Sequence, residues 1–166
     1  MMSLFKDTGL RWLWLSVLAL GLDQWTKTWA ENNMEGRVIE VMPHFNLILA
    51  HNKGAAFSFL ADAGGWQLWF FSILAIAISI GLIVWLSQLK RDERWLGIAL
   101  ALVLSGAIGN VIDRLIYGYV IDFIDWYIEG YHWPAFNIAD SAIVIGAIML
   151  LIDSLFFAER KENESK

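Results

Sequence analysis

The stretch W-Q-L-W-F-F-S-I-L-A-I-A-I-S-I-G-L-I-V-W-L (Trp66–Leu86) decides the fold class, because it is apolar almost throughout and carries no charge. A helix needs about 20 mostly apolar residues to cross the hydrocarbon core of a bilayer. Three more stretches are long enough or nearly so, at roughly Leu10–Ala30, Trp95–Leu115 and Ile138–Phe157. With 58% hydrophobic and 17% charged residues in 166, the chain is predicted to be an all-α membrane protein, one domain (1–166) with four transmembrane helices.

The first apolar stretch is the least regular of the four, since Asp23, Gln24 and Lys27 interrupt it. A cleavable signal peptide is therefore an alternative to a span there. Thr28-Trp29-Ala30 matches the small residues of a cleavage site poorly, which favours the span. Asp23 and Lys27 are four residues apart, so they are predicted to form a structural ion pair on one helix face.

Lysine and arginine are distributed unequally about these stretches. One side of the predicted membrane carries Lys6, Arg11, Lys90, Arg91, Arg94, Arg160, Lys161 and Lys166, and the other carries Lys27, Arg37, Lys53 and Arg114. Cytoplasmic loops of membrane proteins are enriched in Lys and Arg, so both termini are predicted to be cytoplasmic. The segments 31–65 and 116–137 are then predicted to lie outside.

The first outer segment has the composition of two short strands. Arg37–Met42 and Phe45–His51 are rich in β-branched and aromatic residues and are separated by Pro43-His44. They predict a small sheet on the outer leaflet. Ala55–Leu60 is apolar again and is predicted to dip toward the membrane. The second outer segment, with aromatic residues around its acids, is predicted to form an interfacial lid or surface.

Two aspartates stand at the outer edge of the predicted membrane. Asp122 lies in V-I-D-F (Val120–Phe123), and Asp140 lies in F-N-I-A-D (Phe136–Asp140) at the start of the last span. Ionisable groups at the edge of a membrane segment are costly and are therefore functional candidates. Two carboxyls that face each other can share a proton and activate water, as in aspartic proteases.

Each aspartate also has an ordinary structural interpretation. Asp122 would be a loop acid. Asp140 would sit in the first helical turn beneath an N-cap, Asn137, where the helix dipole favours a negative charge. The second interpretation is compatible with catalysis, because an ionised Asp140 would serve as the base while Asp122 holds the proton.

Asn110 and Arg114 close the third span and share one helix face, with Gly106 and Gly109 near it. These glycines would let another backbone or a substrate approach closely. Spacing alone favours a plainer interpretation, a helix-packing glycine pair with an arginine that extends to the interface.

The sequence gives little support to a metal site, a serine protease mechanism or nucleic-acid binding. His44, His51 and His132 lack metal-ligand spacing and the chain has no cysteine, so no metal or other cofactor is expected. Ser105 lacks the first glycine of a rhomboid-like G-x-S-G motif, and no predicted span supplies a histidine base. No basic patch indicates a nucleic-acid partner.

Five segments together closely resemble the type II lipoprotein signal peptidase family of bacteria in order, spacing and topology. They are D-Q-W-T-K (Asp23–Lys27), N-K-G-A-A-F-S-F (Asn52–Phe59), G-N-V-I-D-R (Gly109–Arg114), V-I-D-F (Val120–Phe123) and F-N-I-A-D-S-A (Phe136–Ala142). The resemblance covers essentially the whole chain. It implies an aspartic endopeptidase of the bacterial inner membrane that cleaves prolipoproteins before a cysteine already carrying a diacylglyceryl group.

The same resemblance implies a role for nine residues. The catalytic pair would be Asp122 and Asp140, the groups that hold the substrate backbone would be Asn52, Gly54, Asn110, Arg114 and Asn137, and the supporting positions would be Asp23 and Gly106. The implied fold is four transmembrane helices with a small periplasmic sheet and loop over the active site. The expected partners are the lipid-modified substrate and membrane lipids, and the protein is expected to work as a monomer.

Two other classes remain open on the residues alone. A proton or ion carrier would also use membrane-edge acids, but it should place ionisable groups near the bilayer midplane, often with broken helices. A non-catalytic scaffold would explain the glycines and aromatic residues but leaves the two carboxylates without a purpose. Cleavage of a lipid-modified precursor by the purified protein separates these classes.

Overall fold

The computed structural model describes residues 7–54 and 64–156. Its helical part begins with a short 3-10 turn and continues in four long helices. These are η1 (Gly9–Trp12), α2 (Leu13–Asn33), α3 (Trp66–Gln88), α4 (Arg94–Tyr117) and α5 (Ile138–Phe156). The four predicted apolar stretches therefore correspond to the four long helices, with ends that differ by a few residues.

Within the described residues, α3, α4 and α5 are long and apolar enough to cross a membrane. Helix α2 has 21 residues, but its C-terminal half carries Asp23, Lys27 and Glu31. Both Asp23 and Lys27 are buried against the other helices rather than facing the surroundings. The polar interruption of α2 is thus an internal feature of the helix bundle.

Four strands form one antiparallel sheet in the order β1-β2-β3-β4. They are β1 (Ile39–Met42), β2 (Phe45–Asn52), β3 (Val120–Ile128) and β4 (Tyr131–His132). The first two agree with the predicted strands. The prediction of an interfacial lid or surface for 116–137 named no strands, and the structure shows that this segment supplies β3 and β4. Glu129 and Gly130 join them with positive φ angles of 50° and 85°, as a tight hairpin turn requires.

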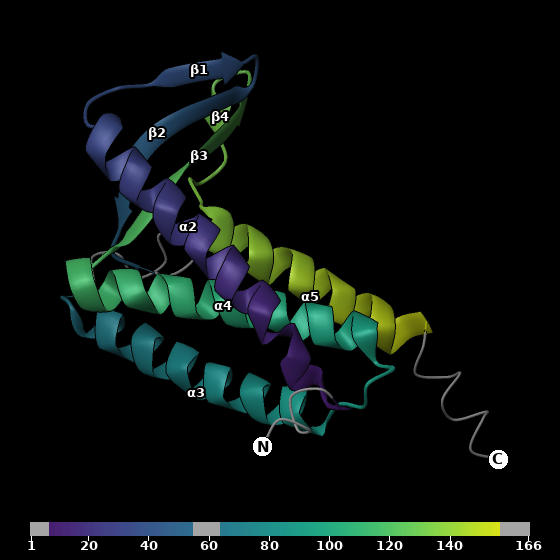
Figure 1. Cartoon of the computed structure of the whole chain (residues 1–166). Helices are drawn as coiled ribbons and strands as arrows, with labels where there is room; N and C mark the ends of the chain where they lie inside the picture. Colours follow the sequence, from purple (N-terminus) through teal and green to yellow (C-terminus); the bar gives the residue numbers. More distant parts are fainter. Residues whose placement is uncertain (1–6, 55–63, 157–166) are drawn as a thin grey trace.

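Helix α4 is the centre of the bundle: α2, α3 and α5 each pack against it (Figure 1). Toward the end away from the sheet, leucines of α3 and α4 form one buried cluster that includes Leu82, Leu86, Leu100 and Leu104. Toward the other end, Ala30 and Met34 at the end of α2 pack with Phe123 of β3. This second cluster fixes the sheet to the helices.

The sheet lies at the end of the bundle where α4 finishes and α5 begins (Figure 1). Gly118 ends α4 in the left-handed conformation, at φ 80°, and the chain turns directly into β3. Strand β3 pairs with β2, with Ala50 opposite Asp122 and Asn52 opposite Val120. The apolar segment predicted to dip toward the membrane, Ala55–Leu60, lies outside the described residues.

Candidate active site

Asp122 lies on a buried strand. Its side chain is only 2% exposed, and its neighbours Ile121 and Phe123 are buried as well. The interpretation of Asp122 as an ordinary loop acid is therefore wrong. A carboxyl group in such a position needs hydrogen-bond partners, because an unpaired buried charge is very costly.

Two asparagines supply those partners. Asn52 Nδ2 donates to Asp122 Oδ2 at 3.0 Å, and Asn137 Nδ2 donates to Asp122 Oδ1 at 2.7 Å. Asn52 comes from the end of β2, and Asn137 immediately precedes α5. The Asp122 carboxyl is thus held between the sheet and the start of the last helix.

Asp140 lies in the first turn of α5, where a reciprocal pair of bonds closes the helix start. Asn137 Oδ1 accepts from the Asp140 backbone N–H at 2.9 Å, and Asp140 Oδ2 accepts from the Asn137 backbone N–H at 3.2 Å. This is the geometry of a capping box. The predicted N-cap interaction is therefore present, and it also fixes the Asp140 carboxyl.

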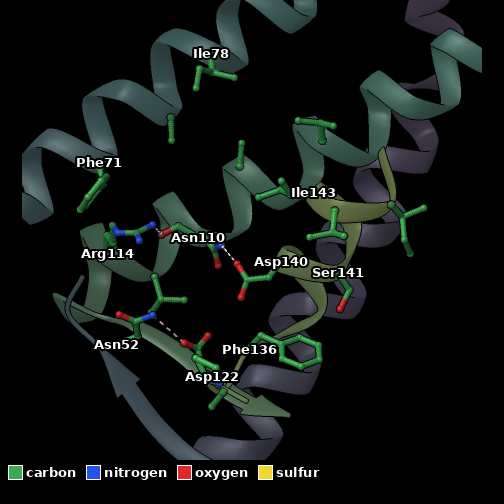
Figure 2. A pocket seen from close by; sticks show the side chains of 18 of the residues that line it. Asn52, Phe71, Ile78, Asn110, Arg114, Asp122, Phe136, Asp140, Ser141 and Ile143 are labelled. Carbon is green, nitrogen blue, oxygen red and sulfur yellow. Dashed lines mark hydrogen bonds between the residues drawn. The ribbon is translucent and has the colours of Figure 1, made fainter. Parts of the chain in front are cut away.

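Asn137 contacts both carboxyl groups, one through its side-chain amide and the other through its backbone N–H. Figure 2 shows Asp122 on β3 and Asp140 on α5 facing the same space, with Asn110 beside Asp140 and Asn52 beside Asp122. Asn110 Nδ2 donates to Asp140 Oδ1 at 2.8 Å. Three asparagine side chains therefore bind the two carboxyl groups.

Arg114 lies at the edge of the same space. Its Nη2 donates to the carbonyl oxygen of Gly54 at 2.9 Å, and its Nη1 donates to the carbonyl oxygen of Asn110 at 3.2 Å. Gly54 N in turn donates to Asn52 Oδ1 at 2.9 Å. Arg114 is thus not free at the interface, as the packing interpretation had it, but links the end of α4 to the chain that follows β2.

Burial raises the pKa of Asp122 from its ordinary value of 3.8 to about 7. The second cause is repulsion from the negative charge of Asp140. The hydrogen bonds from Asn52 and Asn137 act in the opposite direction but do not compensate. Near neutral pH, therefore, Asp122 readily holds a proton while it faces a second carboxyl.

A buried charge cluster lies behind the site. Lys27 Nζ forms ion pairs of 2.9 Å with Asp23 Oδ2 and with Asp113 Oδ2. Asp23 Oδ1 accepts from the backbone N–H of Ala139 at 2.8 Å, and Asp113 Oδ2 accepts from that of Ile121 at 3.1 Å. Each acid thus fixes the backbone next to one member of the carboxyl pair. The ion pair predicted between Asp23 and Lys27 is present.

Sequence reasoning gave no role to Gln24 and Asp113, and it gave Lys27 only the ion pair with Asp23. Gln24 donates to Asp113 Oδ1 at 2.9 Å and to the carbonyl oxygen of Gly109 at 3.3 Å. Asp113 pairs with Lys27, and Lys27 reaches Asn110. A sequence signal existed, because Asp113 follows Asn110 by three residues and therefore lies close to its helix face.

Two glycines of α4 allow this assembly. A Cβ on Gly106 would overlap the carbonyl oxygen of Ala139, and one on Gly109 would lie 2.6 Å from Asp23 Oδ2. The predicted close approach at these glycines is therefore a contact with α2 and α5. Ser105, on the same helix, donates to the carbonyl oxygen of Leu102 at 2.7 Å, in line with a packing role.

A cavity of about 700 Å³ begins at the carboxyl pair and extends between α3 and α5 over α4. Its polar end is lined by Asn52, Asn110, Arg114, Asp122 and Asp140. The remainder is apolar, with Phe71, Leu74 and Ile78 from α3 and Ile143 and Val144 from α5 among its walls. The site therefore combines a hydrogen-bonded carboxyl pair with a long hydrophobic space.

None of the histidines lines the cavity at the carboxyl pair. His51 contacts Glu31 at 3.0 Å, and His132 contacts Asp125 at 2.9 Å. Among residues 7–54 and 64–156, no group of three or more His, Cys, Asp or Glu side chains could hold a metal ion.

Two facing carboxyls, fixed at the end of membrane-length helices, are the arrangement of an aspartic peptidase built into a membrane. Comparison with known proteins agrees. The family described as Signal peptidase (SPase) II, Peptidase_A8, matches residues 15–156. The chain belongs to this family of aspartic peptidases.

Relatives and solved structures extend the match over nearly the whole chain. A lipoprotein signal peptidase of Alteromonas mediterranea is 52% identical, covering 99% of this chain and 91% of the relative. One of Aeromonas hydrophila is also 52% identical, covering 94% of each. A solved structure described as a bacterial membrane enzyme is 36% identical with a TM-score of 0.81, covering 91% of each chain. A second is 37% identical with a TM-score of 0.75.

Proposed function

We propose that Asp122 and Asp140 are the catalytic pair that activates a water molecule in the removal of signal peptides from prolipoproteins, the activity of the family to which this chain belongs. The observation that carries this assignment is the arrangement of the two carboxyls on one cavity. They are joined through Asn137, and burial and Asp140 raise the pKa of Asp122 to about 7. A carboxyl that keeps its proton next to one that is ionised supplies the acid and the base that peptide hydrolysis needs.

In this mechanism Asp140 is the base and Asp122 the acid. Asp140 accepts hydrogen bonds from Asn110 and Asn137 at the N-terminus of α5, which favours its ionised form. It takes a proton from water, and the hydroxide attacks the carbonyl carbon of the bond before the lipidated cysteine. Asp122 hydrogen-bonds the carbonyl oxygen and neutralises the developing charge. The C–N bond then breaks, and the leaving amine takes a proton from the pair.

The groups around the pair are suited to hold the substrate backbone. Asn52 and Asn110 line the cavity beside the two carboxyls and carry amides that can bind peptide groups. Arg114 offers a guanidinium at the cavity edge, and its bond to Gly54 sets its direction. Held in this way, the scissile carbonyl is kept within reach of the activated water.

The apolar part of the cavity fits a substrate that is itself hydrophobic. A signal helix and two acyl chains present only hydrocarbon surface, and the walls from α3 and α5 offer the same. Binding of the acyl chains would also set the position of the modified cysteine relative to the pair. The diacylglyceryl group is then part of what the enzyme recognises.

The topology belongs to the same proposal. Both termini are cytoplasmic, the four long helices span the bacterial inner membrane as one domain, and the sheet and carboxyl pair face the periplasm. The excess of Lys and Arg on the opposite side supports this orientation. The protein acts as a monomer and needs no cofactor, because the two carboxyls and water suffice for the reaction.

The test is cleavage of a lipid-modified precursor by the purified protein and its variants. Asp122→Asn and Asp140→Asn should each nearly abolish cleavage, and the double variant should be hardly worse, because members of one catalytic unit are not additive. Asp92→Asn is the matched control, since it makes the same change at an exposed residue between α3 and α4. Wild-type activity should withstand chelators and require the lipid. Substantial turnover by a folded Asp122→Asn or Asp140→Asn variant would refute the assignment.

A further inference from the structure

We propose that Lys27 is a positioning residue for the carboxyl pair. Its buried ammonium fixes the side chain of Asn110, and Asn110 in turn holds Asp140 as a carboxylate that accepts hydrogen bonds. This inference rests on the proposed function and adds to it a residue on a different helix. Lys27 belongs to α2 and does not line the cavity. It therefore does not touch the substrate, and it acts on the reaction through the residues that it binds and through its charge, which also acts on Asp122 and Asp140.

The ammonium of Lys27 is fully engaged. The residue is 1% exposed, and Nζ lies 2.9 Å from Asp23 Oδ2, 2.9 Å from Asp113 Oδ2 and 3.0 Å from Asn110 Oδ1. An ammonium has three hydrogens and no acceptor, so these three contacts use all of its donors. The two carboxylates compensate the cost of burying the charge and hold it in place.

This arrangement determines which way the Asn110 amide points. Lys27 can only donate, so the Asn110 atom facing it must be the carbonyl oxygen. Asn137 Nδ2 converges on the same oxygen at 3.3 Å. The NH2 group of Asn110 is therefore directed at Asp140 Oδ1, 2.8 Å away. In the opposite orientation the amide oxygen would face the carboxylate, with no proton between them.

The direction of the hydrogen bonds from Lys27 through Asn110 to Asp140 matters for the ionisation of Asp140. A donor fixed against Asp140 Oδ1 stabilises the carboxylate over the protonated acid. The charged groups around the pair are contributed by α2, α4, β3 and α5, and they are Asp23, Lys27, Asp113, Arg114, Asp122 and Asp140. Lys27 and Arg114 are the cations of this set, and of these two Lys27 is the one bonded to the Asn110 side chain.

Lys27→Met is the direct test, with a lipid-modified precursor and purified protein. We expect kcat to fall on the order of 10- to 100-fold with KM changed by less than about twofold, since positioning is lost and the cavity is not altered. The acidic limb of the kcat profile should move to higher pH by about half a unit or more, because the base is less favoured in its ionised form. A purely structural role would not move that limb.

Three further variants separate this effect from misfolding. Lys27→Met leaves two buried carboxylates without their cation, so the double variant Lys27→Met/Asp113→Asn removes one charge of each sign. Its comparison is Asp113→Asn alone, which keeps the contact between Lys27 and Asn110. Lys27→Gln keeps an N–H donor without the charge and should recover part of the kcat lost in Lys27→Met. Thermal unfolding of each variant reports whether it is folded.

The outcomes are distinct. If the double variant is folded and has the kcat and pH profile of Asp113→Asn, Lys27 is only structural and the inference is wrong. If Lys27→Met raises KM and leaves kcat unchanged, Lys27 affects binding and the inference is equally wrong. Failure of the proposed function is a different result, namely cleavage activity in the Asp122→Asn or Asp140→Asn variant.

Discussion

Gly106 of α4 touches the carbonyl oxygen of Ala139 in α5, in a contact that leaves no room for a side chain on Gly106. Ala139 directly precedes Asp140, and its own N–H is bound by Asp23. The first turn of α5 is therefore held by α4 on one side and by α2 on the other. The position of one carboxyl of the pair depends on this contact.

Gly106→Ala should consequently lower peptidase activity by about tenfold or more, because even a small displacement of Asp140 disturbs the geometry of the reaction. The midpoint of thermal unfolding should fall as well, since the overlap is with backbone that cannot rotate away. The matched control is Gly81→Ala in α3, where a Cβ meets nothing within 4 Å. If Gly106→Ala matches Gly81→Ala in turnover and stability, the contact does not position the pair.

Arg114→Ala should reduce turnover by about 100-fold or more while the protein remains inserted in the membrane, because a fixed positive charge beside the reacting groups is lost. Arg114→Lys should restore only part of the activity, because Arg114 donates from two nitrogens to two carbonyl oxygens and a single ammonium reproduces this geometry poorly. Steady-state cleavage and membrane fractionation measure the two effects. If Arg114→Ala turns over as fast as the wild type, Arg114 has only a packing role.

The stability of Asp122→Asn relative to the wild type should rise with pH. Between pH 4 and pH 7, roughly, folded Asp122 keeps a proton that the unfolded chain has released, because burial raises its pKa to about 7. Wild-type stability therefore falls as pH rises through this window. The free energy of unfolding of Asp122→Asn, taken relative to that of the wild type, should increase by about 2 to 3 kcal/mol between pH 5 and pH 8. Unfolding of both proteins across this range tests the sign, and a constant difference would contradict it.

The orientation in the membrane can be tested with reporter fusions. A reporter placed after Arg91, between α3 and α4, should be cytoplasmic, and one placed within 31–36, at the end of α2, should be periplasmic. The reverse result would put the carboxyl pair on the side opposite to the one proposed.

Much of the helical architecture was predictable, because hydropathy and length depend on local sequence alone. Strand β3 was not predicted, since V-I-D-F-I-D-W-Y-I lacks the alternation of a strand with one face in water. In the structure Val120, Ile121, Asp122 and Phe123 are all buried, so both faces of β3 are covered at this end. The turn at Glu129-Gly130 was the available signal for a hairpin.

The sequence allowed most residues of the site to be predicted, but not the hydrogen bonds and ion pairs between them. The motifs named Asp122, Asp140 and the asparagines, yet no spacing along the chain could show that Asn137 binds both carboxyls or that Lys27 reaches Asn110. These contacts join residues from α2, α4, β3 and the start of α5. They arise only when Gly106 and Gly109 bring the helices close enough together.

The hydrophobic space between α3 and α5 has a practical consequence for inhibitors. In a bilayer or a micelle, the molecules available to fill it are the tails of the surrounding lipid or detergent. An inhibitor that occupies this space must displace such a tail, and it first has to partition out of water into the same layer. Its apparent potency therefore reflects both the enzyme and the amphiphile around it, and a ranking of compounds obtained in one detergent need not hold in another.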